Sequence, residues 1–227
     1  MNINNNNNKI QLGGNVLVPI DVKEQEFKKL MLIYKQGMEQ VQNELMEVQT
    51  SLNKIHDYDV ISNINSRIKT PESIIKKMKK KNYDLNYKNL ISNVNDIAGV
   101  RIVCPFKDDI VKVKNVLENN SKLEILEEKD YINKPKISGY SGYHIIAQTP
   151  VDIGTEQIAN VKVEIQIRTM AMDFWSTTEH KIKYKANNKL SKKDSKKMVM
   201  YAKMINRMDE KISKLNSKYD DKKDSIS

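Results

Sequence analysis

VKVEIQIRTMAMDFWSTTEH, residues 161–180, joins a strand pattern directly to a helix pattern. The first part alternates between apolar and polar side chains, which is the period of a half-buried strand. Its polar positions are Lys162, Glu164, Gln166 and Arg168. The second part predicts a helix, with an N-cap at Thr169 and packing residues at Met170, Phe174 and Trp175.

A strand with acid, amide and guanidinium groups on one face predicts the floor of a polar site. The helix that follows it ends in Glu179 and His180, which adds two titratable groups. The same alternation also fits a solvent-facing edge strand. This stretch alone does not separate the two interpretations.

Length and composition limit the class of protein. The chain has 227 residues, which favours one elaborated domain over two complete ones. No apolar run reaches transmembrane length, and the opening MNINNNNNKI lacks the basic and apolar regions of a signal peptide. The single cysteine, Cys104, lies in an apolar run and is expected to be buried and unpaired. We therefore expect a cytoplasmic protein that does not bind membranes.

The formal net charge of +10 suits a polyanionic partner such as a nucleic acid. Most of that charge is lysine, in a chain also rich in Asn and Ile, a bias that AT-rich coding produces without selection. Arginine is scarce, and a guanidinium group binds phosphate bidentately and stacks on bases. The arginines near polar motifs, Arg67, Arg101 and Arg168, are therefore more informative than the lysines.

The N-terminal part of the chain predicts an arm and a long helix. Residues 1–20 are Asn-rich and predict a flexible arm. From Asp21 onward, apolar residues recur every seven positions in two seams: Met31, Met38, Leu45 and Leu52 in one, and Phe27, Tyr34, Val41, Val48 and Ile55 in the other. Such seams predict a helix that packs against a partner helix.

The C-terminal part, residues 191–227, has a similar pattern. Ser191 and Asp194 predict a capped helix start, and apolar residues then step by three and four from Met198 to Tyr219. The two terminal helices could pair with each other or with a second subunit. We favour globular packing, with the C-terminal helix in an oligomer interface, over a long coiled coil. Residues 21–190 form the expected main domain.

A helix start at Thr70-Pro71 is preceded and followed by cations. Arg67 and Lys69 lie before it, and Ser73 and Lys77 lie one turn apart on one helix face. Cations gathered at a helix N-terminus suit a polyphosphate. A solvated basic face is the alternative interpretation.

Two further stretches carry polar groups between predicted strands. Asp96 precedes a strand with Arg101, and an acid at the mouth of a buried strand is a candidate metal ligand. In the loop of residues 131–144, glycines allow a tight turn, Lys136 can reach phosphate, and an exposed tyrosine offers a stacking plane for a base. An ordinary Gly/Ser hairpin loop is the alternative.

Together, these groups predict a Mg²⁺-dependent enzyme that acts on nucleotides. Asp96 and Glu164 can hold a hard divalent cation, and the cations can carry polyphosphate charge. Phosphoryl-type transfer needs positioning, charge neutralisation and a base. The residues alone do not name the reaction.

Four motifs, in order, resemble those of the RelA/SpoT-type alarmone synthetase family: RIKTPESIIKK (67–77), NDIAGVRIV (95–103), YINKPKISGYSGYH (131–144) and EIQIRTMAMDFWSTTEHKIKYK (164–185). The terminal helices and the lack of a hydrolase domain are similar to the small, single-domain synthetases of low-GC bacteria. The resemblance implies an α/β (α+β) fold with a nucleotidyltransferase-like mixed sheet flanked by helices, and a homotetramer. It also implies pyrophosphate transfer from ATP to the 3′-OH of GDP or GTP.

By motif position, the resemblance also implies roles for residues at the ATP side. Arg67 and Arg101 would enclose the adenine. Lys69, Ser73 and Lys77 would hold the ATP phosphates.

At the acceptor side, the resemblance implies that Asp96 and Glu164 bind Mg²⁺, with Glu164 as the base for the 3′-OH. Tyr140 would stack on guanine, and Glu179 would shape the far wall. The residues that would orient the acceptor and its phosphates are Lys136, His144 and Gln166.

One position departs from the family pattern. The loop usually reads G-Y-x-S-x-H, and here Gly142 replaces the serine, which is expected to affect acceptor positioning more than the chemistry. Residues 127–130 lie where family members differ in acceptor preference, and they do not separate GDP from GTP.

Two other functions remain open. Some relatives resemble toxins that pyrophosphorylate the 3′ end of tRNA, which the charge of +10 would suit. A nucleotide- or RNA-binding regulator with a degenerate site would fit Gly142 and the excess of lysine. Regulation by single-stranded RNA or by an alarmone is a further expectation.

Overall fold

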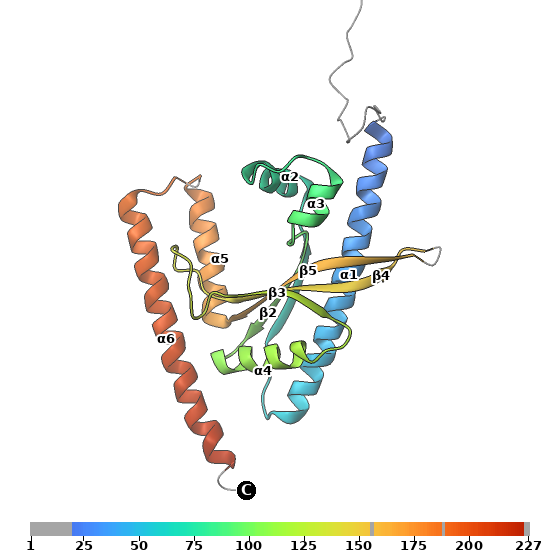
Figure 1. Ribbon diagram of the computed structural model, residues 1–227. Helices are drawn as coiled ribbons and strands as arrows, with labels where there is room; N and C mark the ends of the chain where they lie inside the picture. The colour runs from blue at the N-terminus through green and yellow to red at the C-terminus, as the bar shows by residue number, and fades with distance from the viewer. Residues whose placement is uncertain (1–19, 155–156, 188, 225–227) are drawn as a thin grey trace, which may run out of the picture.

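A computed structural model describes residues 20–154, 157–187 and 189–224 (Figure 1). Residues 1–19 of the predicted arm lie outside the described residues. The helices are α1 (Ile20–Ile55), α2 (Pro71–Lys80), α3 (Tyr87–Asn93), α4 (Lys107–Glu118), α5 (Met170–Lys185) and α6 (Lys192–Asp224). The strands are β1 (Asn63–Ile68), β2 (Ala98–Cys104), β3 (Glu124–Asp130), β4 (Tyr143–Asp152) and β5 (Ile158–Thr169).

The strands form one mixed sheet in the order β1-β2-β5-β4-β3. β2 and β5 are parallel, whereas the other neighbours are antiparallel. The predicted fold class, a mixed sheet flanked by helices with long helices at both ends, is confirmed.

The sheet has one apolar face and one polar face, because side chains alternate along each strand. On β5, Val163, Ile165 and Ile167 are fully buried in the core, together with apolar residues of β2, β4, α1 and α4. The intervening positions of β5 are polar and line up with Gly99 and Arg101 on β2. The sheet therefore separates the core from a polar surface. That surface is not a solvent-facing edge, because β5 lies at the centre of the sheet.

The seams of α1 pack against the sheet, so the prediction of a partner helix is wrong for α1. Tyr34, Val41 and Leu45 are buried in the main core with sheet residues, while Ile55, at the helix end, is 74% exposed. A seven-residue seam specifies an apolar stripe but does not specify what covers it. Figure 1 shows α1 and α6 on opposite sides of the molecule, so the two terminal helices do not pair with each other.

α6 packs beside α5 (Figure 1) through a small apolar cluster of Trp175, Met198 and Ala202. The hydroxyl of Ser191 accepts a hydrogen bond from the Asp194 backbone N–H, as the predicted helix start requires. Ile205 is partly buried against this cluster, and the other seam residues of α6 are exposed: Tyr201, Met208, Ile212, Leu215 and Tyr219. α6 therefore presents an apolar stripe that the described chain leaves uncovered.

Several local predictions need correction. Met170 and Phe174 are 54% and 62% exposed, because α5 turns Met172, Trp175 and Glu179 inward instead. β4 extends to Asp152 and β5 begins at Ile158, so the strand of Glu164 starts before Val161, where its alternating pattern begins. β1 and α3 were not predicted. Within the described residues, no helix is long and apolar enough to cross a membrane.

Candidate active site

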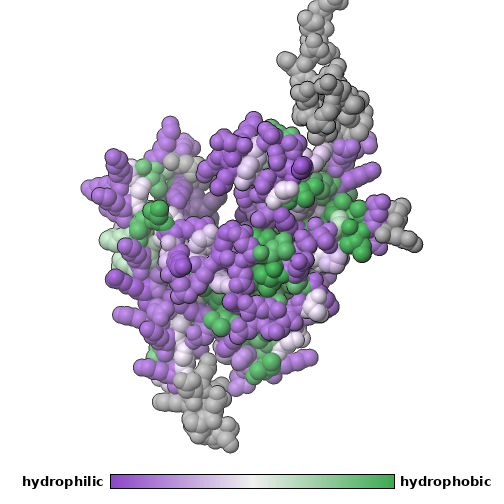
Figure 2. Space-filling model, viewed as in Figure 1, coloured by the Kyte–Doolittle hydropathy of each residue, from purple (hydrophilic) through white to green (hydrophobic). Residues whose placement is uncertain are grey.

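The polar face of the sheet carries a cavity of about 220 Å³ between the start of β2 and the middle of β5. Both predicted carboxylates, Asp96 and Glu164, line it. The other lining residues are Asn65, Ser66, Arg67, Gly99, Val100, Arg101 and Gln166. Figure 2 shows the surface hollowed between the α2 and α5 sides of the molecule. The two acids, 68 positions apart in the chain, are thus brought into one site.

Asp96 is held by the cations that precede and follow the start of α2. Lys69 Nζ lies 2.9 Å from Asp96 Oδ2, and Lys77 Nζ lies 2.8 Å from Oδ1. The hydroxyl of Thr70 caps α2, as predicted; Lys69 directly precedes this cap, and Lys77 lies in the last turn of the helix. Burial would raise the pKa of Asp96, but hydrogen bonds from Lys77 and Lys69 and their charges lower it overall. Asp96 is therefore ionised at neutral pH.

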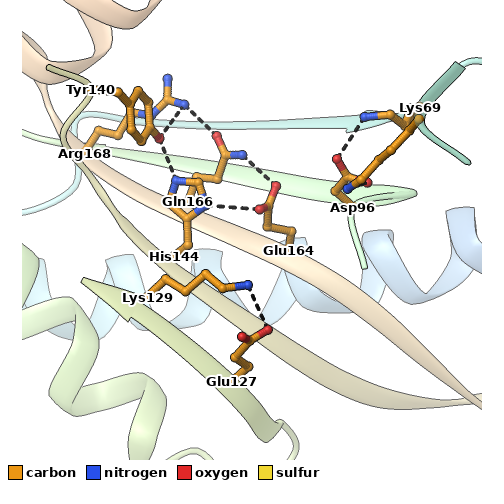
Figure 3. Close-up of polar contacts among 10 residues, drawn as sticks. Lys69, Asp96, Glu127, Lys129, Tyr140, His144, Glu164, Gln166 and Arg168 are labelled. Atoms are coloured by element: carbon orange, nitrogen blue, oxygen red, sulfur yellow. Dashed lines mark hydrogen bonds and ion pairs between the residues drawn. The ribbon is translucent and has the colours of Figure 1, made fainter. Parts of the chain in front are cut away.

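Glu164 belongs to a closed ring of five side chains (Figure 3). His144 Nδ1 lies 3.1 Å from Glu164 Oε1, and Gln166 Nε2 donates to Glu164 Oε2 at 2.7 Å. The hydroxyl of Tyr140 lies 2.6 Å from His144 Nε2. Arg168 Nη2 closes the ring by donating to Tyr140 at 3.0 Å and to Gln166 Oε1 at 2.7 Å.

Every hydrogen bond in this ring is donated in the direction that leads from Arg168 to Glu164. A carboxylate only accepts, so His144 donates from Nδ1 and, when neutral, accepts the Tyr140 hydroxyl hydrogen at Nε2. One arm runs through Tyr140 and His144, and the other runs through Gln166. Burial would raise the pKa of Glu164, but the hydrogen bond and charge of His144 and the Gln166 hydrogen bond outweigh it, so the pKa is lowered. Glu164 is therefore ionised and can accept a proton.

A second acid, Asp173, joins this ring to the wall of the cavity. Its Oδ1 lies 3.0 Å from Arg168 Nη1 and 3.2 Å from Arg101 Nη1. Burial and the nearby Arg168 charge lower the pKa of Arg101, and Asp173 opposes that shift. The buried Nε atoms of Arg101 and Arg168 have no hydrogen-bond partner among the described residues. Each guanidinium group therefore has one buried donor that no described residue satisfies.

The prediction of an exposed tyrosine in the 131–144 loop is wrong for Tyr140. Its side chain is buried, at 8% exposed, with Lys136 Nζ 4.8 Å from the ring centroid and Arg168 Cζ 5.2 Å from it. Lys136 also lies over Tyr131, and burial lowers its pKa. The contact of Arg168 with the Tyr140 ring joins the loop to β5, and cation–π attraction favours it. A base that stacks on Tyr140 has to displace one of those cations.

The remaining predicted residues lie at the edges of the site. Ser73 is exposed in the first turn of α2, where it contacts Thr70 Oγ1. Glu179 is buried on α5 and paired with Lys183, and its charge acts on Lys136. Glu179 therefore lies on the loop side of the site. Neither residue touches the cavity between the two carboxylates.

Sequence reasoning missed the role of Arg168 as the hub of the ring and missed Asp173 altogether. A weak signal was available for Arg168, because arginine is scarce and this one follows Glu164 and Gln166 at strand spacing. Asp173 lies five positions later, across the turn from strand to helix. No periodicity relates residues on the two sides of such a turn.

The carboxylates suit a magnesium ion that is shared with a substrate. Mg²⁺ is bound by one or two carboxylates together with substrate phosphates, and it keeps several waters. Asp96 and Glu164 provide those carboxylates in one cavity, and the charge of Asp96 partly counteracts the low pKa of Glu164. No group of three or more His, Cys, Asp or Glu side chains suited to a metal occurs in the described part of the chain. The residues thus fit a two-carboxylate site and not a closed protein cage.

Comparison with known proteins agrees with this geometry. The chain is 38% identical over 196 residues to GTP pyrophosphokinase YwaC of Bacillus subtilis, covering 86% of this chain and 93% of that protein. It is 32% identical over 192 residues to GTP pyrophosphokinase YjbM of the same organism, covering 85% and 89%.

Solved structures give the same result. Small alarmone synthetase 1 of Bacillus subtilis bound to its product pppGpp matches with a TM-score of 0.79 and 31% identity, over 86% of this chain and 98% of that one. Small alarmone synthetase 2 of the same organism matches with a TM-score of 0.76 and 36% identity, over 85% and 99%. A family described as "Region found in RelA / SpoT proteins" matches residues 66–189, which is more than half of the chain. The chain therefore belongs to the RelA/SpoT family.

Proposed function

We propose that the protein transfers the β,γ-pyrophosphate of ATP to the ribose 3′-OH of GDP or GTP, forming (p)ppGpp and AMP. The observation that carries the proposal is the cavity in which Asp96 and Glu164 meet, with Lys69 and Lys77 on one side and the ring of Glu164 on the other. Its relatives YwaC and YjbM are named GTP pyrophosphokinases. The two lysines suit the negative charge of a polyphosphate donor, and the ionised Glu164 suits a hydroxyl acceptor.

In the proposed reaction, the acceptor 3′-oxygen attacks the β-phosphorus of ATP. The new bond joins that oxygen to the β-phosphorus, and the bond from the β-phosphorus to the α,β-bridging oxygen breaks, so AMP leaves. Glu164 accepts the 3′-OH proton, for which its ionised state is suited. Positioning and charge neutralisation supply most of the acceleration in such transfers.

At the ATP side, Arg67 and Arg101 face the cavity and are proposed to enclose the adenine. Lys69 and Lys77 now hold Asp96, and both are within reach of phosphates that enter beside it. Ser73, exposed one turn into α2, extends the phosphate site.

Magnesium held by Asp96 and Glu164 would neutralise charge on the transferred group. The side chains of the chain itself then orient both nucleotides around those two carboxylates.

At the acceptor side, Tyr140 is proposed to stack on guanine after Lys136 leaves its ring face. Lys136, His144 and Gln166 would then orient the ribose and phosphates, and Glu179 would shape the wall behind Lys136. Residues 127–130 lie on β3, where Glu127 and Lys129 form an exposed ion pair at 2.9 Å. These residues do not separate GDP from GTP as the acceptor.

We also propose a homotetramer in the cytoplasm, the compartment that supplies these nucleotides. The exposed seam of α6, with Met208 at 54%, Ile212 at 46% and Leu215 at 55% exposed, supports an interface between copies. Light scattering on the purified protein measures the mass of the assembly and tests this directly.

The test of the reaction is a nucleotide chromatogram. The protein is incubated with ATP and MgCl₂, together with GDP, GTP or deacylated tRNA in separate reactions. We expect AMP and a 3′-pyrophosphorylated guanine nucleotide in the first two reactions. A product formed on tRNA alone would favour an enzyme that pyrophosphorylates the 3′ end of tRNA, a substrate that suits the net charge of +10.

The matched control is Glu164→Gln, which keeps the shape of the side chain and removes the base. We expect its rate to fall by ~10² or more. Full activity of this variant would rule out Glu164 as the base. If AMP release is absent while single-stranded RNA binds tightly, the protein is a binding regulator and not a synthetase.

A further inference from the structure

Two arginines that serve different halves of the site share one carboxylate oxygen. Arg101 lines the cavity beside Asp96, on the side proposed for ATP. Arg168 is the hub of the ring that contains Tyr140 and His144, on the side proposed for the acceptor. Asp173 Oδ1 lies 3.2 Å from Arg101 Nη1 and 3.0 Å from Arg168 Nη1.

The Asp173 oxygen that both arginines share offsets the repulsion between their positive charges. Arg101, Arg168 and Arg67 are close enough that the charges of the other two lower the pKa of Arg101, after burial itself. Asp173 is the acid that acts in the opposite direction. Asp173 lies in the first turn of α5, where a negative charge also interacts favourably with the helix dipole. The position of each guanidinium group therefore depends on the position of the other.

The ring connects Arg168 to Glu164, the proposed base, so the position of Glu164 also depends on Arg168. Arg168 is only 5% exposed, and its Nη2 donates to both arms that end on Glu164. Its Nη1 is committed to Asp173. A shift of Asp173 therefore moves both arms together, whereas a shift of Gln166 or His144 moves only one.

We propose that Asp173 is a positioning residue that couples the two nucleotide sites. This inference rests on the proposed function, because it assigns ATP to the Arg101 side and the guanine nucleotide to the ring side. A nucleotide that fixes Arg101 fixes Asp173 and thereby Arg168, so the ring is already ordered when the second nucleotide binds. Ordering by one ligand lowers the entropy cost for the other, and the effect is reciprocal.

A purely structural Asp173 makes a different prediction. If it only neutralised the arginines, its loss would weaken the fold or both nucleotide affinities. The affinity for one nucleotide would still respond to the other by the same factor. The ratio of affinities therefore separates coupling from support.

The experiment measures that ratio by calorimetry with the full-length protein and Mg²⁺. The affinity for GDP is measured with and without saturating α,β-methylene-ATP, and the reverse titration is then made. In the unmodified protein we expect each nucleotide to tighten the other by a factor in the range of about 5–150. In Asp173→Asn, which keeps the size of the side chain and removes its charge, we expect the factor to fall to about 1.

Asp152→Asn is the matched control, with the same change of charge. Asp152 lies eight positions along β4 from His144, about 26 Å away at strand spacing. It caps the hairpin turn by accepting from the Gly154 N–H, a bond that asparagine also makes. We expect its coupling factor to equal that of the unmodified protein.

Arg168→Lys provides an independent test if Asp173→Asn folds poorly. Lysine keeps the charge but cannot hold Asp173 and both arms at once, so coupling is again expected to vanish. An unchanged coupling factor in either folded variant, or a factor of 1 in the unmodified protein, overturns the proposal. Because no turnover is needed, these results differ from failure of the proposed function, which the nucleotide chromatogram reports.

Discussion

His144 Nδ1 lies 3.1 Å from Glu164 Oε1, on the strand next to the one that carries the glutamate. The His144 ring is nearly buried, and its other nitrogen lies 2.6 Å from the Tyr140 hydroxyl. Both hydrogen-bonding positions of the imidazole are thus used, and the proton on Nδ1 faces the carboxylate. Burial raises the pKa of Glu164, and the hydrogen bond and charge of His144 act against that effect and lower it.

Replacement of that neighbour is expected to shift the pH dependence of the reaction. In His144→Leu, Glu164 loses the hydrogen bond and charge that lower its pKa, while its burial persists, so the pKa rises. The acidic limb of the profile of kcat against pH is expected to move to higher pH. Steady-state assays that extend well below pH 4.5, the ordinary pKa of a Glu carboxyl, measure it, with His56→Leu, outside the site, as the control. A profile that keeps its acidic limb in place would contradict the role given to His144.

Loss of Lys77 is expected to weaken ATP binding. In Lys77→Ala, Asp96 keeps Lys69 but loses a second cation at 2.8 Å, and one of the cations proposed to hold the ATP phosphates is removed. We expect KM for ATP to rise about tenfold or more, as loss of a charged hydrogen bond of roughly 1.5–3 kcal/mol implies. KM for the guanine nucleotide should change little.

Lys80→Ala is the control for that measurement. Lys80 is exposed on the same helix and contributes no contact to Asp96. If both variants raise KM for ATP equally, the basic face of α2 acts as a general positive field and Lys77 has no specific position in the site.

We expect an added side chain to have opposite effects at Gly99 and at Gly37. A Cβ at Gly99 would be 3.7 Å from the nearest atom, the Glu164 carbonyl oxygen, so the backbone tolerates it. The added side chain would enter the cavity between Asp96 and Glu164. In Gly99→Leu we expect activity to fall by at least ~10² while the melting temperature stays within a few degrees.

Gly37→Ala should do the reverse. Its Cβ would lie 2.7 Å from Val161 Cγ1, where α1 packs on β5, so the helix has to move. Overpacking of this kind costs typically ~1–3 kcal/mol. We expect a lower melting temperature with near-normal activity at 20 °C. Thermal unfolding and initial rates on the two variants check both statements, and a stable but inactive Gly37→Ala would contradict them.

Acid is expected to destabilise the fold through the two site carboxylates. Asp96 and Glu164 have folded-state pKa values below their ordinary values of 3.8 and 4.5. A lowered folded pKa stabilises the native state above the unfolded pKa, and that contribution is lost as pH falls through the folded value. The double variant Asp96→Asn with Glu164→Gln should therefore show a shallower loss of melting temperature below about pH 4.5 than the unmodified protein. Parallel curves for the two proteins would contradict this assignment.

The elements that local patterns specify were predictable. The strand of Glu164, the Thr169 and Thr70 caps and the long terminal helices follow from periodicity and capping, which act over a few residues. β1 was missed because it is a short edge strand with half of its positions exposed, so its apolar signal is weak. The seam of α1 could not reveal that the helix faces a sheet, because an apolar stripe does not specify what covers it.

The site was predictable as a set of residues but not as an arrangement. The motif resemblance placed Asp96, Glu164 and Arg101 in one site, and the structure brings them to one cavity. The ring through Arg168 and the burial of Tyr140 depend on contacts among β4, β5 and the 131–144 loop. Such contacts are decided by tertiary packing, which no local pattern encodes.

The alternation along β5 has a consequence for how this sequence can diverge. Glu164, Gln166 and Arg168 interleave with Val163, Ile165 and Ile167, which are fully buried. A one-residue insertion or deletion within this strand would send the three polar groups into the core and the three aliphatic ones to the cavity. Substitutions in β5 can therefore be tested one at a time, but its length cannot drift, and indels among homologues should be confined to the connections outside it.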